Sequence, residues 1–120
     1  MIKIRRGVVD FFSQAAANLH PKEFSALLRI EKNIVEEVIV VPMTNFGSGF
    51  TVMEFMHLPI SIKYQGSVHS HPSPSNNPSN ADLLFFSKTG KYHIIISWPY
   101  LPENIAVYSH SGQKVDFEII

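Results

Sequence analysis

The stretch YQGSVHSHPSPSNNPSNADLLFFSK, residues 64–88, contains the features that decide the fold of this chain. The sequence predicts a strand over residues 64–71. It predicts a loop over residues 72–78, because three prolines lie there among serines and asparagines. Residues 79–88 predict a helix that stops at Gly90, since glycine is a common C-terminal stop. A strand, a stiff loop and a helix therefore follow one another directly.

The elements on both sides of this stretch follow from the spacing of apolar residues. A short strand is predicted over residues 2–6 and a helix over 8–19, which ends because Pro21 disfavours helical geometry before it. Further strands are predicted over residues 24–30, 35–41, 50–55, 91–97, 103–109 and 114–119, with polar turns at 31–33 and 111–112. Helices interspersed with strands predict a mixed α/β domain.

Length and composition narrow the class of protein. The chain has 120 residues, 45% of them apolar, so we expect one domain spanning residues 1–120. Ten basic side chains balance ten acidic ones without a basic block, which argues against nucleic acid or anionic lipid as a partner. The longest apolar runs fall far below the roughly 18 residues that a membrane helix needs. We therefore expect a cytoplasmic protein that does not enter a membrane.

Two histidines in the strand over residues 64–71 have the spacing of metal ligands. Side chains two apart on a strand leave the same face, so His69 and His71 can converge on one ion while Ser70 points away. The chain has no cysteine, so histidine and carboxylate must hold any metal. Zinc suits these donors, and a catalytic zinc site uses three protein ligands and one water. Asp82, in the first turn of the next predicted helix, is the nearest carboxylate downstream.

Asp82 also has a purely structural explanation. Ser79-x-x-Asp82 before an apolar run approximates a helix capping box, which contributes about 1 kcal/mol. One carboxylate oxygen can bind a metal while the other accepts a hydrogen bond, so capping and ligation are compatible. A hydrolytic zinc site also needs a base that is not a ligand, and Glu23 and Glu54 are both candidates on or beside predicted strands. Spacing alone does not choose between them.

This pattern resembles the JAMM (MPN-plus) zinc metalloproteases, in which an upstream Glu is followed by His-x-His-Pro-x6-Ser-x-x-Asp. Here the pattern stands as His69-Ser70-His71-Pro72, six residues, and then Ser79-Asn80-Ala81-Asp82. At ordinary residue frequencies these five fixed types arise at one starting position on the order of once in ten million. The similarity covers most of the chain and is strongest to the short, single-domain archaeal members.

The resemblance implies a fold and a set of site residues. The fold is α+β, of the cytidine-deaminase-like MPN/JAB type, with a mixed, curved sheet flanked by helices. The implied cofactor is Zn²⁺, bound by His69, His71 and Asp82. The resemblance also implies that Glu23 is the general base of the two candidates and that Ser79 helps to stabilise the oxyanion.

The family's activity implies a substrate class. Its members cleave isopeptide or peptide bonds at the C-terminal tail of ubiquitin-like proteins, so the resemblance implies an isopeptidase that acts on small modifiers and their conjugates. A processing peptidase for a ubiquitin-like sulfur carrier is an alternative within the same chemistry. A non-catalytic MPN scaffold module is another, although such modules typically lack motif residues that are all present here. The exposed strand edges of a small sheet are compatible with a homodimer.

Other residues carry weaker signals. Four histidines have no partner at ligand spacing and are expected to be structural or exposed: His20, His57, His93 and His110. Residues 51–55 and 74–77 are the first candidates for the walls of a substrate cleft. The Trp-Pro-Tyr segment at residues 98–100 is interpreted as a turn at the end of a strand in preference to a partner surface.

Overall fold

The computed structural model describes residues 1–40 and 63–120. Along the chain the elements are β1 (Ile2–Ile4), α1 (Arg6–Leu19), β2 (Ser25–Glu31), β3 (Ile34–Ile39), β4 (Gly66–His71), α3 (Asn80–Lys88), β5 (Tyr92–Ser97), the 3-10 helix η1 (Pro102–Asn104), β6 (Ile105–Ser109), β7 (Lys114–Val115) and β8 (Phe117–Ile119). The strand predicted over residues 50–55 lies outside the described residues. Both predicted helices are present.

The strands of the described residues form one mixed sheet in the order β7-β6-β5-β4-β2-β3-β1-β8. Strand β4 lies near its middle, antiparallel to β2 and parallel to β5. Strands β7 and β8 form its two edges although only Asp116 separates them in sequence. The edges therefore lie close together, and the sheet curves towards a barrel.

The curvature of the sheet explains why one strand prediction, for residues 114–119, is wrong. In place of a single strand, β7 pairs with β6 and β8 pairs with β1, at the other edge of the sheet. The chain turns at Asp116 to cross from one edge to the other, while Val115 and Phe117 both stay half-buried. The α+β fold with a curved, mixed sheet and flanking helices is confirmed.

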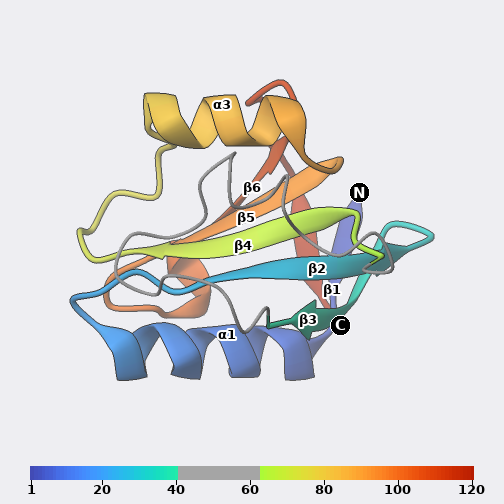
Figure 1. The fold of residues 1–120 in the computed structure, drawn as a ribbon. Helices are drawn as coiled ribbons and strands as arrows, with labels where there is room; N and C mark the ends of the chain where they lie inside the picture. Colours follow the sequence, from blue (N-terminus) through green and yellow to red (C-terminus); the bar gives the residue numbers. More distant parts are fainter. Residues whose placement is uncertain (41–62) are drawn as a thin grey trace.

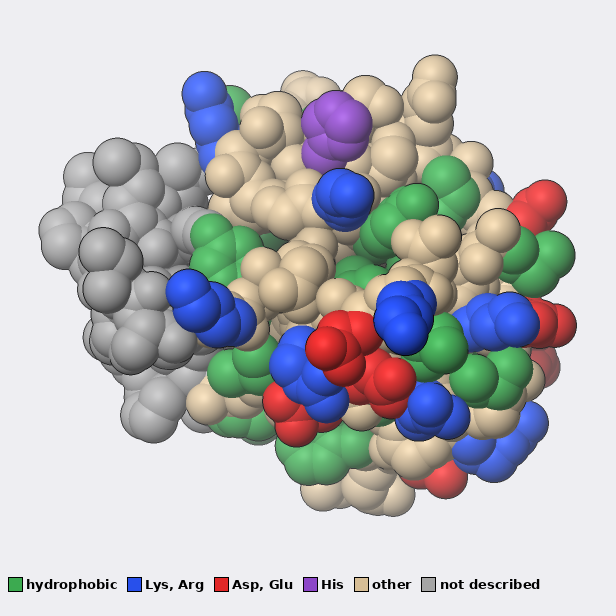
Figure 2. Space-filling view, turned by 90° about the vertical axis from the view of Figure 1, so that its right-hand side faces the viewer, with side chains coloured by type: hydrophobic (Ala, Val, Ile, Leu, Met, Phe, Trp, Pro, Cys, Tyr) green, Lys and Arg blue, Asp and Glu red, His purple; other side chains and the backbone are tan. Residues whose placement is uncertain are grey.

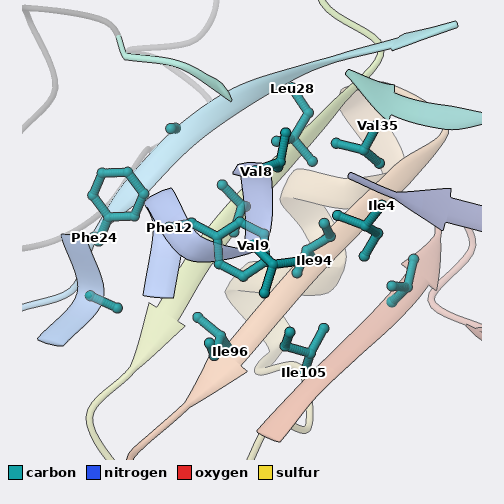
Figure 3. Packing of buried hydrophobic residues seen from close by; sticks show 14 of the residues in the cluster. Ile4, Val8, Val9, Phe12, Phe24, Leu28, Val35, Ile94, Ile96 and Ile105 are labelled. Atoms are coloured by element: carbon teal, nitrogen blue, oxygen red, sulfur yellow. The ribbon is translucent and has the colours of Figure 1, made fainter. Parts of the chain in front are cut away.

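The two helices cover opposite faces of the sheet, α1 below and α3 above in Figure 1. In β5, Ile94 and Ile96 pack on the α1 side against Val8 and Phe12 (Figure 3), whereas Ile95 packs on the α3 side. Both faces of this strand are covered, which explains its continuous apolar run. In the described parts of the chain, no helix is long and apolar enough to cross a membrane.

Two tight turns depend on positive backbone φ angles. Lys32 and Asn33 have φ angles of 51° and 63°, as a two-residue turn of type I′ requires, so the predicted β2–β3 hairpin is confirmed. Gly90 has a φ of 59°, and a Cβ there would lie 2.5 Å from the carbonyl oxygen of Gln65. Glycine therefore allows the chain that leaves α3 to pass directly over the start of β4.

The segment before β6 also differs from the prediction. Residues 102–104 form the 3-10 helix η1 where the start of a strand was expected. Pro102 has no N–H to donate to a neighbouring strand, and the Asn104 side chain accepts a hydrogen bond from the backbone N–H of Leu101 at 3.0 Å. This local bond replaces strand pairing and turns the chain into β6.

Charges of opposite sign alternate on the face that carries β1 and β3. Figure 2 shows Lys and Arg side chains interspersed with Asp and Glu side chains there. Arg29 lies 2.7 Å from Glu31 and 2.8 Å from Glu37, and Arg5 pairs with Glu36. The balanced composition of the chain is thus also a local balance on this face.

Candidate metal centre

Strand β4 carries the two histidines predicted to bind a metal. The rings of His69 and His71 lie on one face of the sheet with centroids 5.7 Å apart. This is the face covered by α3, because the His69 ring lies 5.8 Å from the ring of Phe86 in that helix. Ser70, between the histidines, is fully buried, and its hydroxyl accepts a hydrogen bond from the backbone N–H of Phe24 at 2.8 Å.

The first turn of α3 directs Asp82 at these histidines. Ser79 is the N-cap residue, and its hydroxyl oxygen accepts a hydrogen bond from the N–H of Asp82 at 3.1 Å. The Asp82 carboxylate in turn accepts one from the N–H of Ser79 at 2.9 Å. This reciprocal pair is a capping box. The carboxylate also faces the imidazoles, so capping and an approach to the metal ligands coexist in one side chain.

Three donor atoms meet at this point. His69 Nε2 lies 3.0 Å from Oδ1 of Asp82, and His71 Nε2 lies 3.1 Å from Oδ2. The donor atoms of all three residues lie within 4.8 Å of one another. The side chains are 10%, 14% and 16% exposed, so the cluster is largely shielded from water but open on one side.

The surroundings control the charges of the cluster. Burial acts to raise the pKa of the Asp82 carboxyl, but its contacts with His69 and His71 outweigh burial and hold that pKa well below its usual range. Burial acts to lower the pKa of His71, but Asp82 and the carbonyl oxygen of Ser75 outweigh it and raise that pKa. Asp82 is therefore held ionised, the form in which a carboxylate binds a metal.

The hydrogen bonds of the histidines show whether a metal fits. His71 Nδ1 lies 3.1 Å from the carbonyl oxygen of Ser75, which can only accept, so Nδ1 carries the hydrogen. In the neutral ring, the lone pair of Nε2 then faces a carboxylate oxygen, which is unfavourable unless a cation lies between them. His69 Nε2 is also buried and makes no hydrogen bond of good geometry. In the neutral rings, both Nε2 lone pairs therefore need a cation as a partner.

Zinc satisfies this need. Two imidazole nitrogens and one carboxylate form a three-ligand zinc set that leaves one position open for water or substrate. Neighbouring donors around a tetrahedral zinc lie roughly 3.3 Å apart, and the His-to-Asp82 separations here are 3.0 Å and 3.1 Å. The hydrogen bond from His71 to Ser75 is the kind of outer contact that orients a metal-bound imidazole.

Glu23 comes close to this cluster although it is distant in sequence. The register between β2 and β4 pairs Ser25 with His69. Glu23 lies two residues before Ser25, just outside β2, and lines the same pocket as His71. Glu23 is half-buried, and its charge helps to raise the pKa of His71. Glu54, the other candidate base, lies outside the described residues.

One pocket of about 400 Å³ brings these residues together. Its walls are Glu23, Ser25, His69, His71, Pro72, Ser73, Ser75, Asn77, Ser79, Ala81, Asp82 and Phe85. All five residues that the sequence and the resemblance single out are among them. Of the two predicted cleft segments, residues 74–77 contribute to the wall and residues 51–55 lie outside the described part of the chain.

Some contributors have no signal in the sequence. The Ser75 contact comes from a backbone carbonyl, which any residue type supplies, so no motif identifies it. Ser25 lines the pocket because of its strand pairing. Among the other histidines, Nδ1 of His20 and the Tyr100 hydroxyl share a hydrogen bond of 2.7 Å. His93 is fully buried, and its ring stacks 4.4 Å from that of Phe86. Burial lowers the pKa of His93 to about 4.

The capping box leads to a stability prediction. Ser79→Ala removes the hydroxyl that accepts from Asp82, so we expect a loss of about 1 kcal/mol in the free energy of unfolding, measured by denaturant titration. Ser87→Ala in the same helix is the matched control, because its hydroxyl bonds only to the carbonyl of Leu84 and is exposed. We expect it to stay within about 0.5 kcal/mol of the parent protein. Equal losses in the two variants would contradict the capping role.

A shielded cluster of two histidines and an aspartate on a curved α+β sheet defines a class of protein, the domains with a metalloprotease-like zinc site. The comparisons with known proteins agree with this class. Residues 5–110 match the family described as prokaryotic homologs of the JAB domain. A protein of Haloferax volcanii named probable metalloprotease is 31% identical over 130 residues, covering all of this chain and 80% of the relative.

Solved structures resemble this chain over almost their full length. One, described as "JAMM: a metalloprotease-like zinc site in the proteasome and signalosome", is 38% identical with a TM-score of 0.76, over 100% of this chain and 98% of that one. A JAB1/MPN domain protein from Archaeoglobus fulgidus is 39% identical with a TM-score of 0.79, over 99% of both chains. The chain therefore belongs to the JAMM/MPN family, in its prokaryotic JAB branch, and its centre is a zinc site.

Proposed function

We propose that this protein is a zinc isopeptidase that removes ubiquitin-like modifiers from their conjugates at the C-terminal tail. The observation that carries the proposal is the pocket in which Glu23 and Ser79 face the cluster of His69, His71 and Asp82. A scaffold module would need the metal cluster at most, and would not need a base and a hydroxyl donor beside it. One pocket thus contains the residues that the proposed hydrolysis requires, which supports the proposal.

The ligands named above would hold the zinc, which when bound acts as a Lewis acid on a scissile carbonyl and lowers the pKa of water. The chain supplies the proton transfer. Glu23 is not among the three clustered donors, and it is half-buried and lines the same pocket as His71. We assign to Glu23 the removal of a proton from the attacking water and its delivery to the leaving amine. No covalent bond to the protein forms.

Ser79 is proposed to stabilise the negative charge that develops on the substrate carbonyl. Its hydroxyl oxygen already accepts the hydrogen bond from Asp82, so the hydroxyl hydrogen is free to donate into the pocket. The N-cap position also holds this hydroxyl in one place before substrate arrives, which is what electrostatic stabilisation of a transition state requires.

The proposal is tested by cleavage of two defined substrates. A ubiquitin-like protein fused linearly to a reporter, and the same modifier attached to a lysine through an isopeptide bond, are incubated with the zinc-loaded protein and followed by gel electrophoresis. We expect cleavage of the isopeptide substrate that stops with a chelator and returns with added zinc.

The other outcomes separate the alternatives. Cleavage of the linear fusion alone would support the processing peptidase for a sulfur carrier. Binding of the modifier without cleavage of either substrate would support a scaffold. Cleavage that a chelator does not affect would contradict a metal mechanism altogether.

A further inference from the structure

The loop between β4 and α3 orients a zinc ligand although it contains no helix or strand. Within residues 72–79, the carbonyl oxygen of Ser75 accepts the hydrogen bond from Nδ1 of His71 at 3.1 Å. The direction of Nε2, on the opposite side of the same ring, depends on where that carbonyl lies. Something must therefore hold Ser75 in place.

The next residue, Asn76, is anchored from two distant elements. The hydroxyl of Tyr108, in β6, donates to the carbonyl oxygen of Asn76 at 2.9 Å. The side-chain amide of Asn76 donates to the carbonyl oxygen of Asn104, in η1, at 3.1 Å. These partners lie 32 and 28 residues away in sequence. The loop is thus bonded to the rest of the domain through both the backbone and the side chain of Asn76.

Both anchors are themselves held by packing or hydrogen bonding. Tyr108 is 4% exposed, and its ring stacks 6.1 Å from that of Phe86, which in turn packs against the ligand His69. Asn104 ends η1, and its side chain accepts the hydrogen bond from Leu101 that closes this turn. The Tyr108 hydroxyl and the Asn104 carbonyl oxygen therefore each have a defined direction towards Asn76.

We propose that Asn76, Asn104 and Tyr108 form a latch that positions His71 for zinc. The latch fixes Asn76, Asn76 fixes the neighbouring Ser75 carbonyl, and that carbonyl selects the tautomer and the orientation of His71. The three are positioning residues, since none of them lines the metal pocket. The proposal depends on the zinc centre and not on the substrate proposed above.

Tyr108→Phe tests the latch, with Tyr100→Phe as its matched control. Each change removes one hydroxyl from a tyrosine that is at most 6% exposed, and each breaks one hydrogen bond, to Asn76 or to His20. Only the first bond leads to a zinc ligand. Zinc affinity is measured by competition with a chromophoric chelator, and stability by the Tm of the zinc-free proteins.

We expect Tyr108→Phe to weaken zinc binding by roughly 10-fold, the lower end of the range for outer contacts of a metal ligand. Tyr100→Phe should bind zinc within about twofold of the parent protein. The two zinc-free variants should show similar decreases in Tm, because each loses one partly buried hydrogen bond. A merely structural role of Tyr108 predicts equal zinc affinities for the two variants.

Asn76→Ala keeps the test decisive if Tyr108→Phe does not fold. Asn76 is a half-buried loop residue, so removal of its amide leaves the core packing intact. It should also weaken zinc binding by roughly 10-fold. Zinc affinities within twofold of the parent in the folded variants would overturn the latch. Failure of the parent protein to bind zinc would overturn the centre, and the latch with it.

Discussion

Glu23→Gln is expected to abolish most of the hydrolysis while zinc remains bound. Glutamine has nearly the same size as glutamate but cannot take a proton from water, and a positioned general base contributes about 10²- to 10⁴-fold to the rate. We therefore expect kcat to fall by about that factor. The zinc affinity should be unchanged, because Glu23 is not among the three clustered donors. Single-turnover cleavage of the isopeptide substrate and a zinc titration measure the two quantities.

Glu54→Gln is the informative comparison for this experiment. From the sequence alone, Glu23 and Glu54 are both candidates for the general base. The pairing of β2 with β4 brings Glu23 to the pocket. We expect the Glu54 variant to retain activity. Parent-like cleavage by Glu23→Gln together with loss in Glu54→Gln would reverse the assignment of the base.

Asp82→Asn is expected to remove zinc while α3 keeps its cap. The asparagine side-chain oxygen can still accept the hydrogen bond from the N–H of Ser79, now made at 2.9 Å. The second, charged oxygen that faces His69 is lost. Because a ligand itself changes, we expect zinc affinity to fall by more than about 100-fold, beyond the effect of outer contacts. Hydrolysis at micromolar zinc should be lost with it.

The matched control for this change is Asp10→Asn. Asp10 is also a helical aspartate, but it lies exposed on α1, on the opposite face of the sheet from α3. Zinc content after dialysis, measured by atomic emission, should be near zero for Asp82→Asn and near one equivalent for Asp10→Asn. A zinc content near one equivalent in both variants would show that the metal binds elsewhere.

Much of the metal centre is predictable because it is local. His69 and His71 share a face through the two-residue period of a strand, and Asp82 follows through one loop and the first turn of a helix. The hairpin is predictable from the polar turn between two apolar runs. The stop at Gly90 is predictable because its φ of 59° is one that glycine adopts readily. No distant pairing enters these predictions.

The positions of the proposed base, Glu23, and of the proposed latch depend on pairings across the sheet. The alternation of apolar residues shows which side chains share a face, but it does not show which strand lies beside which, or in what register. Ser25 lies opposite His69 only in one of many possible registers, and that register decides the place of Glu23. The break at Asp116 likewise arises because the curved sheet brings its two edges together.

The amino-acid sequence by itself determined the candidate zinc ligands and the cap of α3, because these follow from local backbone geometry and a short spacing of residue types. The class of fold followed from the resemblance that this spacing shows to the JAMM family. Only the tertiary structure decided which residues surround the ligands. It paired β2 with β4, which sets Glu23 near His71, and it placed Tyr108 against the loop that orients that histidine. These contacts join residues far apart in the chain, and their geometry is fixed by packing of the whole sheet.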